Sequence, residues 1–338
     1  MPSLRDCLLA GQKQKALEKL KDADRREALN ALFFAAAHSK DAYSLVLVDS
    51  VREALDYFPE DDKTLLRACA LRMMETKKRD WKEPRPVKYS GDPLKHYLDA
   101  LRSNKPEDAR FLSREVLKKV GLKTLADSWL HGTVENPGPA GTHFVVASAC
   151  RRTLAFADSE TTEPLLFWAS EYFAGKIPQK TEEAIEVEDF EELTSDVERL
   201  KRISMRPGEA CSNIVFMHRI KQNLNAVGRH HIAHLVGVVE EAAKKSEEVS
   251  LVVGKKDGTL KGLKEALEKE DMGLVAASMG ALVDENFDDL CVELLRYASA
   301  KNDPKALIAM HAACEIARTM ALDTALPLAQ ATAYVSTV

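Results

Sequence analysis

Residues 130–155 read L-H-G-T-V-E-N-P-G-P-A-G-T-H-F-V-V-A-S-A-C-R-R-T-L-A, and they contain both the clearest break in the chain and the start of a clear helix. Two prolines and two glycines within residues 136–141 end any helix before them, because proline lacks an amide hydrogen and glycine favours turns. From residue 142 onward, apolar residues recur every three or four positions, as on one face of a helix. They are Phe144, Ala147, Cys150 and Leu154. The stretch predicts two helices joined by a sharp turn.

The same spacing extends over nearly the whole chain, with Ala, Leu, Glu, Lys and Arg supplying helix propensity. We therefore predict an all-α protein, built as a multi-helical bundle or an irregular helical array. Only residues 250–258 (S-L-V-V-G-K-K-D-G) have a β-like pattern, and a loop after a helix fits them equally well. Helices are expected at about residues 3–20, 23–38, 40–57, 62–78, 93–103, 106–119, 122–131, 142–157, 160–174, 209–224, 227–246, 259–269, 271–282, 286–300 and 303–320, and after Pro327.

Composition narrows the class of protein. The chain has 338 residues, of which 45% are hydrophobic, so it can bury a large core. Its net charge of −5 gives no broad basic surface for a nucleic acid. The six cysteines form no C-x-x-C pair, which argues against a zinc finger and fits a reducing cytosol. No signal-peptide pattern and no apolar run of about 18 residues occurs, so we expect a soluble cytoplasmic protein with no membrane partner.

Internal similarity indicates an organisation in halves. Residues 50–57 (S-V-R-E-A-L-D-Y) align with residues 149–156 (A-C-R-R-T-L-A-F), and the acidic turns that follow keep this register. The offset is longer than the period of about 20–50 residues in common solenoids, which favours the duplication of a several-helix unit. We predict an N-terminal helical half over residues 1–180, containing two related units, and a C-terminal helical half over residues 181–338, or else one continuous domain.

Histidines are the residues that point to a site. The segment R-H-H-I-A-H at residues 229–234 places His230 and His234 on one face of a predicted helix. The segment H-A-A-C-E pairs His311 with Glu315 in the same way. Helical bundles gather metal ligands from facing helices. We predict His230, His234 and Glu315 as metal ligands, although no H-E-x-x-H motif occurs.

Three histidines are predicted as catalytic residues. His131, His143 and His311 lie beside apolar helical stretches with small neighbours, which leave room for a ligand. Imidazole serves as a general acid or base near neutral pH. The ordinary alternative for any one of these histidines is a hydrogen-bonded position in the core. Imidazole binds iron, zinc, copper and nickel, so the metal is left open as iron or another transition metal.

Three segments resemble the all-helical domain of questin oxidase-like proteins: residues 130–155, the helix L-L-F-W-A-S-E-Y-F at residues 165–173, and G-R-H-H-I-A-H at residues 228–234. The resemblance covers about half of the chain. It implies a helical protein with an inward-facing histidine cluster and an oxidative role. That domain is also found fused to Rieske-type ferredoxin modules, but this chain has no C-x-H…C-x-x-H pattern. The resemblance therefore implies a separate electron donor.

Two functions are compatible with these observations. The first is a metal-binding oxidoreductase whose histidine-lined pocket takes an aromatic or polyketide-like small molecule. The second is a HEAT-like helical scaffold that binds protein partners through a groove, with incidental histidines and an exposed apolar or charged concave surface. The recurring histidines and the resemblance favour the first.

Overall fold

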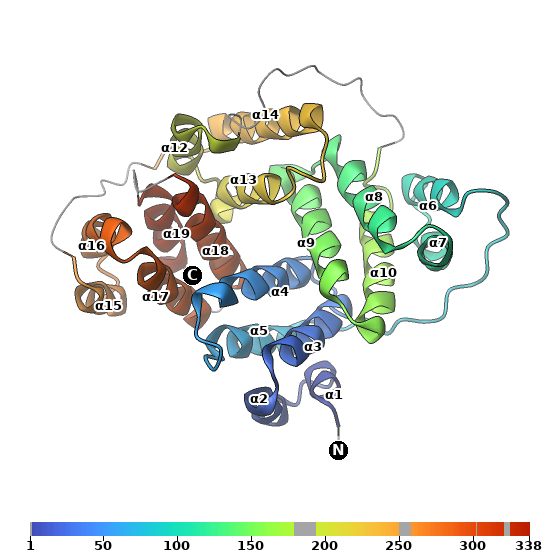
Figure 1. The fold of residues 1–338 in the computed structure, drawn as a ribbon, viewed down its shortest axis with the longest axis horizontal. Coiled ribbons are helices and arrows are strands. Elements are labelled where there is room, and N and C mark those ends of the chain that lie inside the picture. The colour runs from blue at the N-terminus through green and yellow to red at the C-terminus, as the bar shows by residue number, and fades with distance from the viewer. Residues whose placement is uncertain (1, 179–193, 250–257, 302, 321–324) are drawn as a thin grey trace. The chain divides into compact units, whose positions relative to one another are not determined.

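The structure, a computed structural model, describes residues 2–178, 194–249, 258–301, 303–320 and 325–338. Within these ranges the regular secondary structure is helical, apart from one isolated bridge between Ser39 and Lys78 (Figure 1). The predicted all-α class is confirmed. The β-like residues 250–257 lie outside the described ranges. No helix within those ranges combines the length and apolarity that crossing a membrane requires.

Contacts between helices divide the chain into two compact units. Unit 1 comprises residues 1–49, 69–184 and 225–227, and unit 2 comprises residues 50–68, 185–224 and 228–338. Helices α4 (Tyr43–Ala54) and α5 (Thr64–Glu75) each contribute residues to both units. These units differ from the predicted halves mainly in two segments: residues 50–68 belong to unit 2, and residues 225–227 belong to unit 1. The duplication predicted from residues 50–57 and 149–156 stays a prediction.

Unit 1 is built around α10. Besides its parts of α4 and α5, it contains α1 (Leu4–Leu9), α2 (Lys13–Asp22), α3 (Arg25–Ala37), α6 (Pro93–Arg102), α7 (Pro106–Lys119), α8 (Leu122–Val134), α9 (Thr142–Phe156) and α10 (Ser159–Phe173). Helix α10 packs against α3, α7 and α9. Its buried Trp168 donates from Nε1 to the carbonyl of Ser39 over 2.9 Å. Because a buried indole N–H needs an acceptor, this bond fixes how α10 packs.

Two differences from the predicted helices have a clear local cause. The helix predicted at residues 3–20 is two helices, because Gly11 between them has a φ of 66°, a left-handed conformation that ends a helix. The final helix, α19 (Leu326–Ser336), begins before Pro327 and not after it. Proline fits this first turn because its missing amide hydrogen has no partner there.

Unit 2 is built around α18. Besides its parts of α4 and α5, it contains the short η1 turn (Leu55–Tyr57) and α12 (Val197–Met205), α13 (Ser212–Gln222), α14 (Arg229–Lys245), α15 (Leu260–Glu268), α16 (Met272–Glu285), α17 (Phe287–Ala300), α18 (Pro304–Thr319) and α19. Helix α18 packs against α13, α17 and α19 and is buried along most of its length. A polar side chain in the middle of α18 therefore lies inside unit 2.

The same turn precedes α9 in unit 1 and α13 in unit 2. In each, a short 3-10 turn, η2 (Pro139–Gly141) or η3 (Glu209–Cys211), follows a Pro-Gly pair. Gly138 has φ and ψ of 78° and 174°, and Gly208 has 72° and 177°. Only glycine adopts this region readily. The turn predicted at residues 136–141 is confirmed, and its second copy sets the start of α13.

Candidate metal centre

The middle of α18 carries a histidine with no exposed surface. His311 is 0% exposed, and neither of its ring nitrogens has a hydrogen-bond partner among the described residues. Burial lowers the pKa of His311 to about 3, because the charged imidazolium is poorly solvated there. The ring is therefore neutral near pH 7 and offers a lone pair. Buried polar groups are nearly always hydrogen-bonded, so this ring requires an explanation.

His218 faces His311 from α13. The two ring centroids lie 5.3 Å apart, with an interplanar angle of 88°, and His218 is 4% exposed. Asn213 positions the helix that carries His218: its Nδ2 donates to the carbonyl of Arg206 over 2.7 Å, and its backbone N–H donates to the carbonyl of Pro207 over 2.9 Å. The turn before α13 thereby fixes where His218 lies in the second turn of the helix.

Glu53, in the last turn of α4, completes a group of three. Its side chain is 19% exposed, and its Oε2 lies 3.9 Å from Nε2 of His218. Guanidinium groups of Arg52 and Arg219 lie 3.8 Å from its two carboxylate oxygens, so positive charge balances this carboxylate. Glu53 is the member of the group that lies nearest to solvent.

These three side chains have the composition of a metal site, and their ligand atoms lie close together. One ligand atom from each of Glu53, His218 and His311 lies within 4.8 Å of the others. No second group of three possible ligands is this close in the part of the chain that the structure describes. Metal bonds of about 2.0–2.2 Å to nitrogen and oxygen put ligand atoms about 3–4 Å apart. Side-chain shifts of less than about 1 Å would bring all three onto one ion.

Gln222 lies between two of these ligand atoms. Its Nε2 donates to Oε2 of Glu53 over 2.6 Å and lies 2.7 Å from Nε2 of His218, while its Oε1 accepts from Nη1 of Arg219 over 2.8 Å. For the amide to donate to both atoms, Nε2 of His218 must be unprotonated, as in a metal ligand. An ion would compete with the amide hydrogens for these lone pairs. The Gln222 amide therefore has to turn away, or present Oε1, when an ion binds.

Glu315 makes a different contact from the one predicted. It lies one turn beyond His311 on α18, but its Oε1 accepts a 2.7 Å hydrogen bond from the hydroxyl of Tyr57. Burial raises the pKa of Tyr57, so the hydroxyl stays protonated and remains a donor. Glu315 is not in the ligand group.

His230 and His234, the other predicted metal ligands, lie half-buried in the first two turns of α14. The His230 ring lies 3.9 Å, centroid to centroid, from the ring of His231. It also folds over Gly228, where an added Cβ would come within 3.1 Å of Cε1 of His230. Neither residue belongs to the ligand group, and no third ligand within the described ranges closes a site around them.

Two of the three predicted catalytic histidines belong to unit 1 and are hydrogen-bonded to backbone. Nε2 of His131 lies 2.9 Å from the carbonyl oxygen of Ala226, and Nδ1 of His143 lies 3.2 Å from that of Asn136. Burial lowers the pKa of His143. Of the predicted catalytic residues, only His311 belongs to the ligand group.

The local sequence does not single out Glu53 and His218 as site residues. For His218 a signal exists: it stands among apolar residues of a helix that follows the R-P-G break at residues 206–208. Glu53, within V-R-E-A at residues 51–54, has the pattern of an ordinary solvated glutamate. Its role depends on which helices face α4, and this is not visible in the local sequence.

Comparisons with protein-family models, with curated proteins and with solved structures find no match for this chain. The resemblance to questin oxidase-like proteins stays a prediction.

Proposed function

We propose that unit 2 binds a divalent transition-metal ion through Glu53, His218 and His311. The observation that carries the proposal is the full burial of His311 with both ring nitrogens unpaired among the described residues, next to a second histidine and a carboxylate. Coordination would give one of these nitrogens a partner. It would also use the neutral form of the ring, which burial favours.

The donor set limits the kind of ion. Two imidazoles and one carboxylate form the ligand set of many zinc sites and of non-haem iron(II) sites, whereas calcium and magnesium prefer oxygen ligands. We therefore propose zinc(II) or iron(II). Iron(II) would suit the oxidoreductase expected from the sequence, with an aromatic or polyketide-like substrate and a separate electron donor. This narrower proposal is supported by the donor set and by the resemblance.

The alternative, a scaffold for protein partners, predicts a contiguous exposed apolar or charged surface. The large apolar side chains that are exposed in the described ranges come from different elements. They are Val120, Val249, Leu274 and Val338. Because single exposed apolar residues are normal in soluble proteins, they give no support to an apolar docking surface, whereas the group of Glu53, His218 and His311 supports metal binding.

The test is metal content and affinity in untagged protein. We expect one zinc or iron ion per chain by plasma mass spectrometry, or stoichiometric uptake of zinc(II), or of iron(II) under anaerobic conditions, by calorimetry. Glu53→Gln keeps the size of a partly exposed side chain and removes a charged ligand. This variant should bind the ion at least about tenfold more weakly, in line with the contribution of a charged ligand.

The matched control is His234→Gln, because the sequence predicted His234 as a ligand and the structure leaves it outside the group. It should bind the ion as the parent protein does. Failure of the parent protein to take up either ion, or loss of uptake in His234→Gln with retention in Glu53→Gln, would exclude the proposed site.

A further inference from the structure

A second site candidate in unit 2 is a pocket between α12 and α14. Its volume is about 510 Å³, and none of its lining residues belongs to the metal-ligand group. Arg199, Arg202, Ile203 and Arg206 line it from one side. Three of these four positions lie on α12 and the last is its C-terminal cap, and their spacing of three and four residues places them on one helix face. One face of α12 thus forms this side of the pocket.

The residues that line the pocket include more cations than anions. Its charged lining residues are Arg199, Arg202, Arg206, Lys244, Glu240 and Glu248, four cations and two anions. Nε of Arg199 donates to Oε1 of Glu240 over 2.8 Å. At the other end, Nη2 of Arg206 donates to Oε2 of Glu248 over 3.0 Å. Carboxylates outside the lining pair with two of the cations: Oε1 of Glu241 lies 2.6 Å from Nζ of Lys244, and Oδ2 of Asp196 lies 3.7 Å from Nη1 of Arg199. The carboxylates therefore orient most of these cations.

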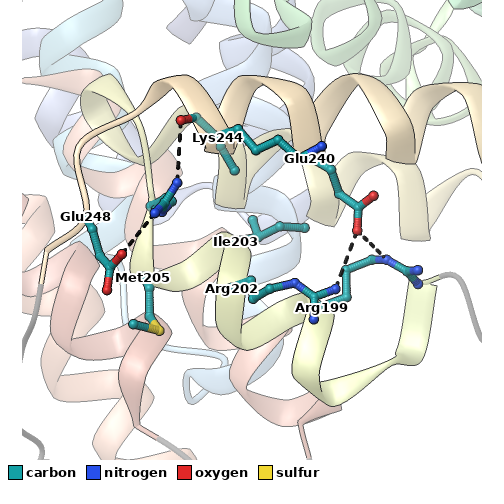
Figure 2. Close-up of a pocket in the computed structure, with 9 residues that line it drawn as sticks. Arg199, Arg202, Ile203, Met205, Glu240, Lys244 and Glu248 are labelled. Atoms are coloured by element: carbon teal, nitrogen blue, oxygen red, sulfur yellow. Dashed lines mark hydrogen bonds and ion pairs between the residues drawn. The ribbon is translucent and has the colours of Figure 1, made fainter.

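Arg202 is the cation that is most available to a ligand. Its side chain is 63% exposed, and its one ion pair among the described residues is a 3.7 Å contact between Nη2 and Oε1 of Glu240. Figure 2 shows Arg202 beside Arg199, with Ile203 between this end of the pocket and the end near Glu248. Between the charged ends, the pocket wall is formed by two apolar residues that are packed against the protein: Ile203 is 2% exposed and Ala243 is 5% exposed.

We propose that this pocket binds a small molecule that carries a phosphate monoester on an apolar body. A phosphate monoester has a charge near −2 at neutral pH, and the exposed guanidinium group of Arg202, beside that of Arg199, offers it a cationic partner. Guanidinium groups present paired N–H donors that fit phosphate oxygens. The volume lies within the range of about 300–1,000 Å³ for small-molecule pockets, and the wall at Ile203 and Ala243 suits an apolar body.

Calorimetric titration with phenyl phosphate tests the proposal, with inorganic phosphate and phenol as reference ligands. Phenyl phosphate should bind saturably at one site per chain. Inorganic phosphate should bind at least about tenfold more weakly, because it buries no apolar surface, and phenol should not bind measurably. Absence of saturable phenyl phosphate binding, or equal affinity for inorganic phosphate, would overturn the proposal.

Two variants with opposite expected effects locate the binding. Arg202→Gln should weaken phenyl phosphate binding by about tenfold, as expected for a charge-assisted hydrogen bond. Glu240→Gln releases Arg199 and Arg202 from a competing carboxylate, so it should strengthen binding by several-fold. A general loss of structure cannot produce tighter binding, and this separates a role in binding from a role in folding.

The matched control is Arg67→Gln, which removes the same charge from an exposed position on α5 and should leave the affinity unchanged. Thermal unfolding followed by circular dichroism verifies that each variant is folded. Unchanged affinity in Arg202→Gln, weaker binding in Glu240→Gln, or equal weakening in Arg67→Gln would each place the phosphate elsewhere. The metal plays no part in this assay, so its outcome is independent of the proposed metal centre.

Discussion

The ring of His311 lies in the core of unit 2 with two polar nitrogens that find no partner among the described residues. Each buried polar group that is left unpaired costs about 1–3 kcal/mol of stability. Nε2 of His218, by contrast, has a hydrogen-bond partner, because it lies 2.7 Å from Nε2 of Gln222. Unit 2 thus holds one imidazole in an unfavourable environment, which a bound ion would relieve.

Gln222 offers a residue-scale test of the metal centre. Replacing it with glutamate exchanges an amide, 2.6 Å from Oε2 of Glu53, for a carboxylate that can act as a fourth ligand. We expect Gln222→Glu to bind zinc(II) at least about tenfold more tightly, because a charged ligand replaces a neutral group. In the metal-free protein, the two adjacent carboxylates should lower stability.

Competition with a fluorescent zinc chelator measures the affinity, and urea unfolding of the chelated protein measures the stability. Gln222→Leu is the control, because it removes the amide without supplying a ligand and should not reach the affinity of Gln222→Glu. Equal affinities of the two variants would show that residue 222 does not face the ion.

Lys78 gives a prediction about pH in unit 1. Burial lowers the pKa of Lys78 to about 8, whereas an unfolded lysine has a pKa of about 10.4. Between these values the unfolded chain holds more protons than the folded chain, so this group makes stability rise with pH. Below pH 8 the Lys78 ammonium group lowers the free energy of unfolding by its full amount. Lys78→Met removes this unfavourable contribution. The free energy of unfolding of the variant minus that of the parent should therefore be about 1–2 kcal/mol lower at pH 10.4 than at pH 7. This expected range is reduced because Lys78 is partly exposed.

Urea unfolding at both pH values, under reducing conditions, measures this change. The variant also loses the hydrogen bonds from Nζ of Lys78 to the carbonyl of Met73 and the hydroxyl of Thr76, which lowers its stability at every pH. The change with pH is therefore the diagnostic quantity. A pH-independent difference between Lys78→Met and the parent protein would contradict the expected pKa of Lys78.

At the scale of elements, the sequence predicts what depends on local interactions. Apolar spacing and breakers predict most of the helices and the turn at residues 136–141, because both are set within a few residues. The break at Gly11 was missed, since the apolar pattern continues across it. Of the three candidate metal ligands, the sequence points only to His311, and it predicts a catalytic role for that residue. Its partners Glu53 and His218 come from helices distant in sequence, and packing between such helices has no local signature.

The repeated turn gives a prediction for two elements at once. Gly138 and Gly208 adopt backbone angles that an alanine reaches only with strain of about 1–3 kcal/mol. A Cβ at Gly138 would also lie 2.6 Å from the ring of His143, and one at Gly208 would lie 2.8 Å from Oγ of Ser212. We expect Gly138→Ala and Gly208→Ala each to lower the free energy of unfolding by at least about 2 kcal/mol.

Gly237 is the matched control for this pair. It lies within α14, and a Cβ there would have no neighbouring atom within 4 Å among the described residues, beyond the backbone of its own helix. Gly237→Ala should therefore raise stability by up to about 1 kcal/mol, because alanine favours the helix. Urea unfolding of the three variants measures the differences, and equal effects at all three positions would mean that the turns do not require glycine.

At the scale of the whole molecule, the two units share parts of their secondary structure. Helices α4 and α5 each run from residues of one unit into residues of the other. A helix forms cooperatively along its length, so we expect loss of one unit to destabilise the shared helices of the other. The predicted halves at residues 1–180 and 181–338 would share no such helix. The local sequence does not reveal this sharing, because it arises from contacts that residues 50–68 make with residues far along the chain.

Binding of zinc(II) to unit 2 should therefore stabilise unit 1 as well. All three tryptophans, Trp81, Trp129 and Trp168, belong to unit 1, so tryptophan fluorescence follows unit 1, while far-ultraviolet circular dichroism follows helices throughout. An ion present at 100 times its dissociation constant stabilises the state that binds it by about 2.7 kcal/mol. We expect zinc(II) to raise the unfolding midpoints by both signals equally in the parent protein, and by a clearly smaller amount in Glu53→Gln at the same zinc(II) concentration. A shift confined to circular dichroism in the parent protein would mean that the units unfold independently, with the metal centre intact.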